Sequence, residues 1–193
     1  GPQFSTRYYF LNKKVWHNDP DPMYFRARFP YNRAKLLATW VTLNGGLGCS
    51  SEDYYNLPED RLDLLRRTMP SHSSQQSRPL DFLENDISHE WLLQDHSGGV
   101  RRTVLGHYNW DSQKPKTVDT HMSEIGLDPA QQYMGFDYWN NEFIAPFSGS
   151  IRSGLPPFGC RNLSIYPVKD YPQVVSTSRH ITQGIVDVKK ETW

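Results

Sequence analysis

Residues 15–22 read VWHNDPDP, and this stretch decides how the first third of the chain is interpreted. Pro20 and Pro22 remove backbone donors and restrict the residues before them to extended conformations. Side chains at i and i+2 of an extended segment point the same way, so Asp19 and Asp21 are predicted to face one pocket, about 6–7 Å apart. Two carboxylates at that separation can do acid and base work. The residues alone also allow a second interpretation, a tight turn whose side chains satisfy local backbone amides.

Helical patterns follow this loop. Apolar residues recur at i, i+3, i+4 and i+7 between residues 32 and 43, which predicts a helix ended by Gly45-Gly46. A second helix is predicted from Pro58, whose fixed φ suits a first helical position, to Pro70. The residues of the first apolar stripe are Ala34, Leu37, Ala38 and Val41, and those of the second are Leu62, Leu65 and Met69.

The segment before the helical patterns is predicted to contain a strand. Residues 4–9 are predicted to form a strand, with a turn at 12–14 and a second apolar step at 15–16. One strand and two helices cannot cover both faces of a sheet, but they would complete a (β/α)8 barrel whose earlier units lie elsewhere. The loop at 18–21 would then stand at the carboxyl-terminal rim, where barrel active sites are built.

The second part of the chain has a β pattern. Residues 71–77 are polar and rich in serine, which predicts a linker or an extended surface connection, with a domain boundary near residue 75. Beyond it, short apolar runs separated by Gly, Pro and Asp predict an antiparallel β-sandwich. We therefore expect a barrel end at 1–74 and a sandwich at 75–193. The predicted strands are 91–93, 100–108, 162–166 and 173–176, with a hairpin turn at 97–99 and a polar loop at 111–116.

Composition limits the classes of partner. Basic and acidic residues number 21 each, so no net charge attracts nucleic acid or an anionic membrane surface. No apolar run approaches the roughly 20 residues that span a bilayer. Neutral carbohydrates fit better, since aromatic faces and short polar side chains bind them. The N-terminus shows no export pattern, which leaves the compartment open, with secreted, periplasmic and lysosomal locations all compatible.

No metal or other cofactor is expected. Cys49 and Cys160 lack the spacing of a zinc site, and the seven histidines show no metal spacing either. A disulfide between the two cysteines stays open, because spacing alone cannot place their Cα atoms within bridging range. Residues 176–180 gather hydroxyls, a cation and an imidazole without an acid beside them, so we interpret them as a strand end.

The loop has a family resemblance. Asn18-Asp19-Pro20-Asp21, with Trp16 before it and Met23 after it, resembles the Trp-Asn-Asp-Pro-Asp-Met loop that follows the last barrel strand in glycoside hydrolase families 27 and 36, the α-galactosidase or melibiase clan. The order of later motifs agrees over residues 15–70. These motifs are Ala38-Thr39-Trp40, the glycine-rich 45–49, Ser51-Glu52-Asp53-Tyr54 and Leu57-Pro58. The inserted His17 and Pro22 depart from the family pattern, which leaves the sugar open, with an α-galactoside as the first candidate.

The resemblance implies a retaining glycoside hydrolase that acts through a covalent glycosyl-aspartate. Asp21 would bind hydroxyls of the sugar in the −1 subsite, Asp19 and Asn18 would shape the loop, and Trp16 would complete the substrate-binding set. The catalytic aspartates of the clan lie on earlier barrel strands, and residues 1–14 contain no carboxylate. The chain alone is therefore expected to lack catalytic residues and to need the missing N-terminal barrel portion as its partner.

A rival interpretation gives the chain no catalytic part. In it, the protein is a carbohydrate-binding or structural β-sandwich module with a helical extension. Affinity for a sugar would then come from Trp110 or Trp139, which lie in the aromatic motifs at 107–110 and 136–139. The same motifs also fit an ordinary sandwich core with one polar atom in each.

Overall fold

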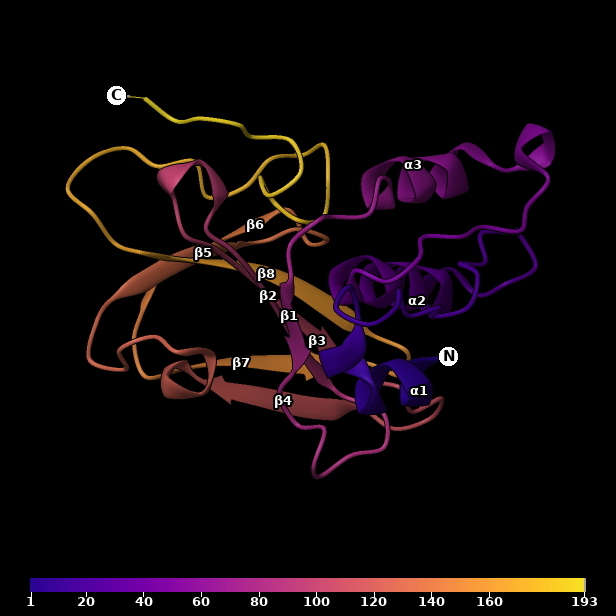
Figure 1. The fold of residues 1–193 in the computed structure, drawn as a ribbon, viewed down its shortest axis with the longest axis horizontal. Helices are drawn as coiled ribbons and strands as arrows, with labels where there is room; N and C mark the ends of the chain where they lie inside the picture. Colours follow the sequence, from indigo (N-terminus) through magenta and orange to yellow (C-terminus); the bar gives the residue numbers. More distant parts are fainter. Residues whose placement is uncertain (193) are drawn as a thin grey trace.

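The computed structural model describes residues 1–192, with helices in the first third of the chain and strands after it (Figure 1). None of the helices within these residues has the length and apolar character needed to cross a bilayer. The helices are α1 (Pro2–Arg7), α2 (Tyr31–Asn44) and α3 (Glu59–Thr68), with short 3₁₀ helices η1 (Tyr9–Leu11), η2 (Tyr54–Asn56), η3 (Ser97–Gly99) and η4 (Met122–Ile125). The strands are β1 (Gln76–Pro79), β2 (Glu90–Asp95), β3 (Arg102–Tyr108), β4 (Lys116–His121), β5 (Tyr133–Asp137), β6 (Glu142–Phe147), β7 (Ser150–Leu155) and β8 (Cys160–Pro167).

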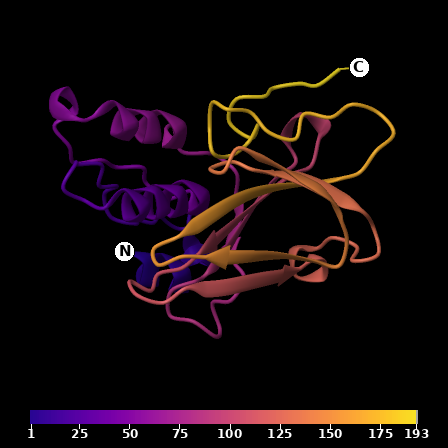
Figure 2. The same ribbon diagram turned by 180° about the vertical axis from the view of Figure 1, so that it is seen from behind.

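The strands form two antiparallel sheets. The larger has the order β1-β2-β3-β8-β5-β6, and the smaller pairs β4 with β7. In both views the helices α2 and α3 lie on one side of the larger sheet, and β4 and β7 lie apart from them (Figures 1 and 2). The predicted mainly antiparallel β architecture of the second part is therefore confirmed.

Strand β3 separates two hydrophobic cores. All seven of its residues are buried, and they alternate between the two faces of the sheet. Val104 and Tyr108 pack with Trp40 of α2, whereas Leu105 packs with Ile151 of β7. The larger sheet is thus covered on one face by α2 and on the other by the smaller sheet.

A glycine in β3 lets the helix approach the sheet. A Cβ added to Gly106 would stand 2.8 Å from Leu43 Cδ1 and would also overlap the Tyr108 hydroxyl. Any side chain here would force either the strand or α2 to shift. Gly106 therefore fixes the distance between α2 and the sheet.

The smaller sheet is joined to the larger one by a buried polar network. His107 contacts Ser153 of β7 through Nδ1 at 2.7 Å and Thr120 of β4 through Nε2 at 2.8 Å. The Thr120 hydroxyl in turn donates to Glu90 of β2. Burial lowers the pKa of His107 to about 3 and raises that of Glu90 to about 7, so the histidine is neutral in the folded protein near pH 7.

The predicted strand at 4–9 is wrong, because α1 occupies this region. The backbone amides of Ser5 and Tyr8 donate to the carbonyls of Gly1 and Phe4, and the rings of Phe4 and Tyr8 pack 4.6 Å apart, one turn from each other. Local helical pairing satisfies backbone groups that have no neighbouring strand here. The turn at 12–14 is confirmed, with Lys13 at a φ of 62°.

Both predicted long helices are confirmed, with one correction. Gly45 ends α2 in the left-handed conformation, at a φ of 69°. In α3, however, the buried positions are Arg61, Leu64 and Thr68, each one residue before a predicted member of the stripe, and Met69 is 37% exposed. Thr68 is short enough to lie against α2, where the Thr42 hydroxyl donates to its carbonyl at 3.1 Å.

Of the two interpretations of residues 71–77, the linker is wrong, because this connection is partly buried. His72 and Ser74 are buried, and β1 begins at Gln76. His72 Nε2 and the Ser77 hydroxyl both donate to the carbonyl of Leu43, at 3.1 and 2.7 Å. The segment is thus tied to the end of α2, and one hydrophobic core contains residues from both sides of position 75.

Among the other predicted β elements, three of the four strands are confirmed in β2, β3 and β8, and the turn at 97–99 connects β2 to β3. The strand at 173–176 is wrong, since both edges of the adjacent β8 are already paired, with β3 and with β5. Within the described residues the first strand is β1, so the expected last barrel unit is not seen as a strand. The boundary near residue 75 stays a prediction.

Replacing Gly106 by alanine is expected to lower the free energy of unfolding by about 1–3 kcal/mol, because the new methyl group overpacks the contact with α2. Gly154 in β7 is the matched control, since no atom lies within 4 Å of the Cβ it would gain. Its alanine variant should stay within about 0.5 kcal/mol of the parent protein. Urea unfolding measures both, and equal losses would contradict the close approach.

Acid is expected to destabilise the protein through His107, whose pKa falls from 6.5 to about 3 on folding. The unfolded chain then binds the extra proton, so the free energy of unfolding falls as pH drops from 6.5 towards 3. This histidine contributes a slope of up to about 1.4 kcal/mol per pH unit. Denaturant unfolding between pH 6.5 and 5 should show a shallower slope for His107→Gln than for the parent. Equal slopes of unfolding free energy against pH in the two proteins would show that His107 does not contribute to the acid destabilisation.

Candidate functional site

Asn18 anchors the loop that the sequence singles out. Its side chain is 2% exposed, accepts a hydrogen bond from Trp16 Nε1 at 2.8 Å and donates to the carbonyl of Tyr8 at 3.3 Å. Its backbone amide donates to Asn12 Oδ1 at 2.9 Å, and its carbonyl accepts from the Leu47 amide at 2.9 Å. Asn18 shapes the loop from inside, while Trp16 lies on the surface and is 44% exposed.

The two aspartates do not form the predicted extended pair. Asp21 has a φ of 73°, and its amide donates to Asp19 Oδ1 at 3.0 Å. Such bonding of a side chain to the amide two residues later is the turn arrangement that the residues also allowed. The prediction of an extended segment with both carboxylates facing one pocket is therefore wrong, because the local hydrogen bond outweighs the preference of residues that precede proline.

Asp21 lines a cavity of about 550 Å³, whereas Asp19 is not in its wall. Asp21 and Arg33 are the charged members of that wall. The Arg33 guanidinium lies over the rings of Phe29 and Phe158, at 5.2 and 5.0 Å from their centres. The rest of the lining is apolar or aromatic, and comprises Pro2, Pro20, Pro22, Tyr24, Phe29, Leu36, Leu37, Ile87, Trp110 and Phe158.

The wall residue Trp110 is held rigidly. Its Nε1 donates to the carbonyl of Ser88 at 2.8 Å, and its ring packs 5.9 Å from Trp40 and 5.8 Å from Tyr108. Side chains that are fixed in this way lose little freedom when a ligand binds.

The chemistry available at the cavity is that of binding. The Asp21 side chain is 64% exposed. A carboxylate accepts hydrogen bonds from hydroxyls, and apolar walls suit the C–H faces of a sugar ring. No second carboxylate stands among the described lining residues, so this cavity offers no pair for general acid and base catalysis.

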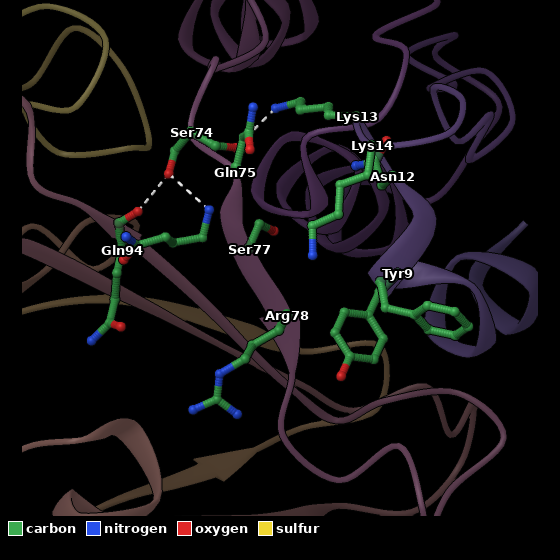
Figure 3. A pocket seen from close by; sticks show the side chains of 11 residues that line it. Tyr9, Asn12, Lys13, Lys14, Ser74, Gln75, Ser77, Arg78 and Gln94 are labelled. Atoms are coloured by element: carbon green, nitrogen blue, oxygen red, sulfur yellow. Dashed lines mark hydrogen bonds between the residues drawn. The ribbon is translucent and has the colours of Figure 1, made fainter.

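A second cavity, of about 250 Å³, lies between η1 and β1 and contains Lys13, Lys14 and Arg78 (Figure 3). The Lys13 ammonium donates to the carbonyls of His72 and Ser74 at 2.8 and 3.0 Å, and burial lowers its pKa. Arg78 points away from the cavity and donates to the carbonyl of Glu124 at 2.9 Å. Two of the three cations thus hold the fold together.

The remaining predicted features have structural roles. His180 is buried, contacts the Thr182 hydroxyl at 2.8 Å and belongs to no strand, so the predicted strand end at 176–180 is wrong. Cys49 and Cys160 are both free thiols, the first exposed and the second buried, and burial raises the pKa of Cys160 to about 11. Within residues 1–192 no three metal-binding side chains come together.

Arg33, Phe29 and Phe158 are wall residues that the sequence analysis did not single out. Arg33 and Phe29 lie in and before the first turn of α2, directly after the loop, so proximity along the chain was an available indication. Phe158 comes from the connection between β7 and β8, and no local pattern connects it to residues 18–21.

No family model and no curated protein matches the chain. Solved structures with the same fold include a GH27 β-L-arabinopyranosidase from Geobacillus stearothermophilus, with a TM-score of 0.71 and 15% identity over 87% of this chain and 41% of that one. The α-galactosidase I from Mortierella vinacea has a TM-score of 0.65 and 12% identity over 83% and 42%. An α-galactosidase from Saccharomyces cerevisiae has a TM-score of 0.63 and 11% identity over 85% and 50%.

These comparisons confirm, at the level of fold, the resemblance that residues 15–70 indicate. The chain spans half or less of the length of the enzymes that it matches. It therefore shares with these glycoside hydrolases the fold of a segment that covers 41–50% of their chains.

Proposed function

We propose that this chain is the C-terminal part of a retaining glycoside hydrolase of the α-galactosidase type, which hydrolyses terminal α-glycosidic bonds. The observation that carries the proposal is the place of Asp21, on a turn beside a cavity lined by aromatic and apolar side chains, in a chain with the fold of glycoside hydrolases. A neutral polyhydroxylated ring fits this combination of one carboxylate and apolar walls.

The enzymes with the same fold narrow the candidate sugars. One is a β-L-arabinopyranosidase and two are α-galactosidases. β-L-arabinopyranose has the ring stereochemistry of α-D-galactopyranose and lacks only the exocyclic hydroxymethyl group. An aryl α-D-galactopyranoside and an aryl β-L-arabinopyranoside are therefore the first substrates to test.

Asp21 would bind hydroxyl groups of the sugar and would take no direct part in breaking the glycosidic bond. Hydrogen bonds from sugar hydroxyls to a carboxylate can strengthen as the ring flattens towards the oxocarbenium-like transition state, and such differential binding accelerates the reaction. A retaining mechanism also needs a nucleophile and an acid/base carboxylate about 5–5.5 Å apart. We assign both to a preceding barrel portion, for which residues 1–74 would supply the last unit.

The N-terminal segment has a surface suited to that portion. Phe4, Phe10, Val15 and Trp16 of this segment are 44–67% exposed, and Leu47, after α2, is 45% exposed. Large apolar side chains gathered on one segment mark a site that another protein surface covers. In the proposal, the missing barrel units pack here, against the segment that contains α1 and η1.

Asp21→Asn, made in the longer protein that contains the barrel portion, is expected to lower turnover of an aryl α-galactoside at least tenfold. That loss corresponds to about 1.4 kcal/mol of transition-state stabilisation. Asparagine tolerates the positive φ of 73° at this position, so the variant removes the charge without straining the turn.

The matched control for this variant is Asp170→Asn, at an exposed aspartate after β8 that is remote in sequence from the loop. Its kinetics should equal those of the parent enzyme. Unchanged turnover in Asp21→Asn would remove Asp21 from the site and favour the binding-module interpretation.

The 193-residue chain by itself is expected to hydrolyse neither aryl glycoside and to bind a hydrophobic dye, because the apolar surface defined above is open to solvent. Phe10→Ser and Val15→Ser should reduce the dye fluorescence, and the longer protein should bind less dye per molecule. Hydrolysis by the chain alone would contradict the assignment of the catalytic carboxylates to the barrel portion.

A further inference from the structure

A third cavity, of about 500 Å³, lies on the side of α3 and β5 and shares no residue with the cavity of Asp21. It is bounded by the start of α2, by α3, by the turn between β5 and β6, and by residues 176–178. Its lining consists of Tyr31, Asp63, Arg67, Phe136, Tyr138, Trp139, Asn141, Ser176, Thr177 and Ser178. We call it the α3 cavity.

The charges of the α3 cavity balance. Arg67 Nε donates to Asp63 Oδ2 at 2.7 Å, and Arg67 Nη1 donates to the carbonyl of Ser178 at 3.3 Å. The wall holds one cation and one anion, so it favours neither a phosphate nor an ammonium group. Within residues 1–192, Asp63 Oδ1 and the Asn141 amide make no hydrogen bond to the protein, so an acceptor and a donor stay available to a ligand.

Aromatic rings make up much of the rest of the wall, and hydrogen bonds hold two of them in place. Trp139 Nε1 donates to the Thr39 hydroxyl at 2.9 Å, and the Tyr138 hydroxyl donates to the carbonyl of Ser178 at 3.0 Å. The two rings meet edge to face at 5.0 Å. Phe136 is half-buried and lines the cavity.

This combination indicates the chemistry of a ligand. A cavity of roughly 300–1,000 Å³ with aromatic walls and a few fixed polar groups is the usual form of a small-molecule site. Balanced charge disfavours ions, and the carboxylate, amide and hydroxyl groups at the rim disfavour a purely apolar ligand. A neutral sugar has the matching surface, with C–H faces for the rings and hydroxyls for Asp63 and Asn141.

We propose that the α3 cavity is a second carbohydrate-binding site, which holds one or two units of a neutral saccharide without cleaving it. It would hold a polymeric or branched substrate away from the loop of Asp21. The binding claim goes beyond the proposed hydrolase activity and does not require it.

The test is a titration of the 193-residue chain with methyl α-D-galactopyranoside, methyl α-D-glucopyranoside, isomaltose and cellobiose, followed by ¹H–¹⁵N correlation spectra. At least one of these sugars should shift the indole resonance of Trp139 in a saturable way, with a dissociation constant in the low millimolar range or tighter. Galacturonate is the charged comparison and should bind no better than its neutral counterpart.

Phe136→Ala is expected to weaken binding of that sugar about tenfold, and Asn141→Asp at least threefold. Asn141 has a φ of 52°, which aspartate also tolerates, so this second variant keeps the turn even if the first one loses stability. Tyr55→Ala removes a fully exposed ring elsewhere and should leave the affinity within twofold.

Three results would overturn the inference: no saturable shift with any sugar at 50 mM, equal affinity in Phe136→Ala and Tyr55→Ala, or shifts confined to residues 16–22. Asp21→Asn separates the two proposals, because it should leave the Trp139 titration unchanged. The two proposals can fail separately: unchanged turnover in Asp21→Asn contradicts the proposed function alone, and the absence of a saturable Trp139 shift contradicts the second site alone.

Discussion

The packing of α2 on the larger sheet is the contact on which the rest of the structure depends. Trp40 is fully buried and meets Trp91 of β2 edge to face at 6.1 Å, and Leu43 lies over Gly106 of β3. Large aromatic rings contribute more buried area than other side chains, so Trp40 dominates this interface. Without this contact, α2 would pack only against α3, and the segment before α2 would lose its support.

That support reaches the loop through the end of the helix. Gly45 turns the chain, and a Cβ on Gly46 would stand 2.5 Å from the carbonyl of Asn18. The Leu47 amide donates to the same carbonyl at 2.9 Å, and the Met23 amide donates to Cys49 at 2.8 Å. Residues 45–49 thus run beside the loop and form backbone hydrogen bonds with it. The close approach leaves no room for a side chain at Gly46, which explains the glycine there.

The sequence predicted the parts of the fold that local patterns determine. The periodicity of α2, its glycine stop and the apolar runs of β2, β3 and β8 are properties of neighbouring residues, and the structure has them. The predictions of a strand at 4–9 and of a linker at 71–77 were wrong because the structure there depends on residues that are distant in sequence. Strand formation needs a distant partner, and burial of His72 depends on the carbonyl of Leu43, which no local pattern shows.

The same limit applies to the site. The sequence identified Asp21 and its loop, but it placed Asp19 beside Asp21 because it could not show the hydrogen bond between Asp19 and the Asp21 amide. It also could not place Phe158, which reaches the cavity from between β7 and β8. The residues of the loop allowed a turn as one of two interpretations. Cavity residues that are distant in sequence could not be predicted from local patterns.

Two adjacent residues of α2 connect the two proposed carbohydrate sites. Trp40 packs 5.9 Å from Trp110, in the wall beside Asp21, while the Thr39 hydroxyl accepts from Trp139 Nε1 at 2.9 Å, in the wall of the α3 cavity. Neighbouring residues of a helix point about 100° apart, so the two tryptophans stand on different sides of α2. A shift of α2 that disturbed one wall would disturb the other. The contact of α2 with the sheet, at Trp40 and Gly106, therefore maintains the shape of both cavities. Trp110 and Trp139, the two rings that the sugar-binding interpretation selects, are both held by α2.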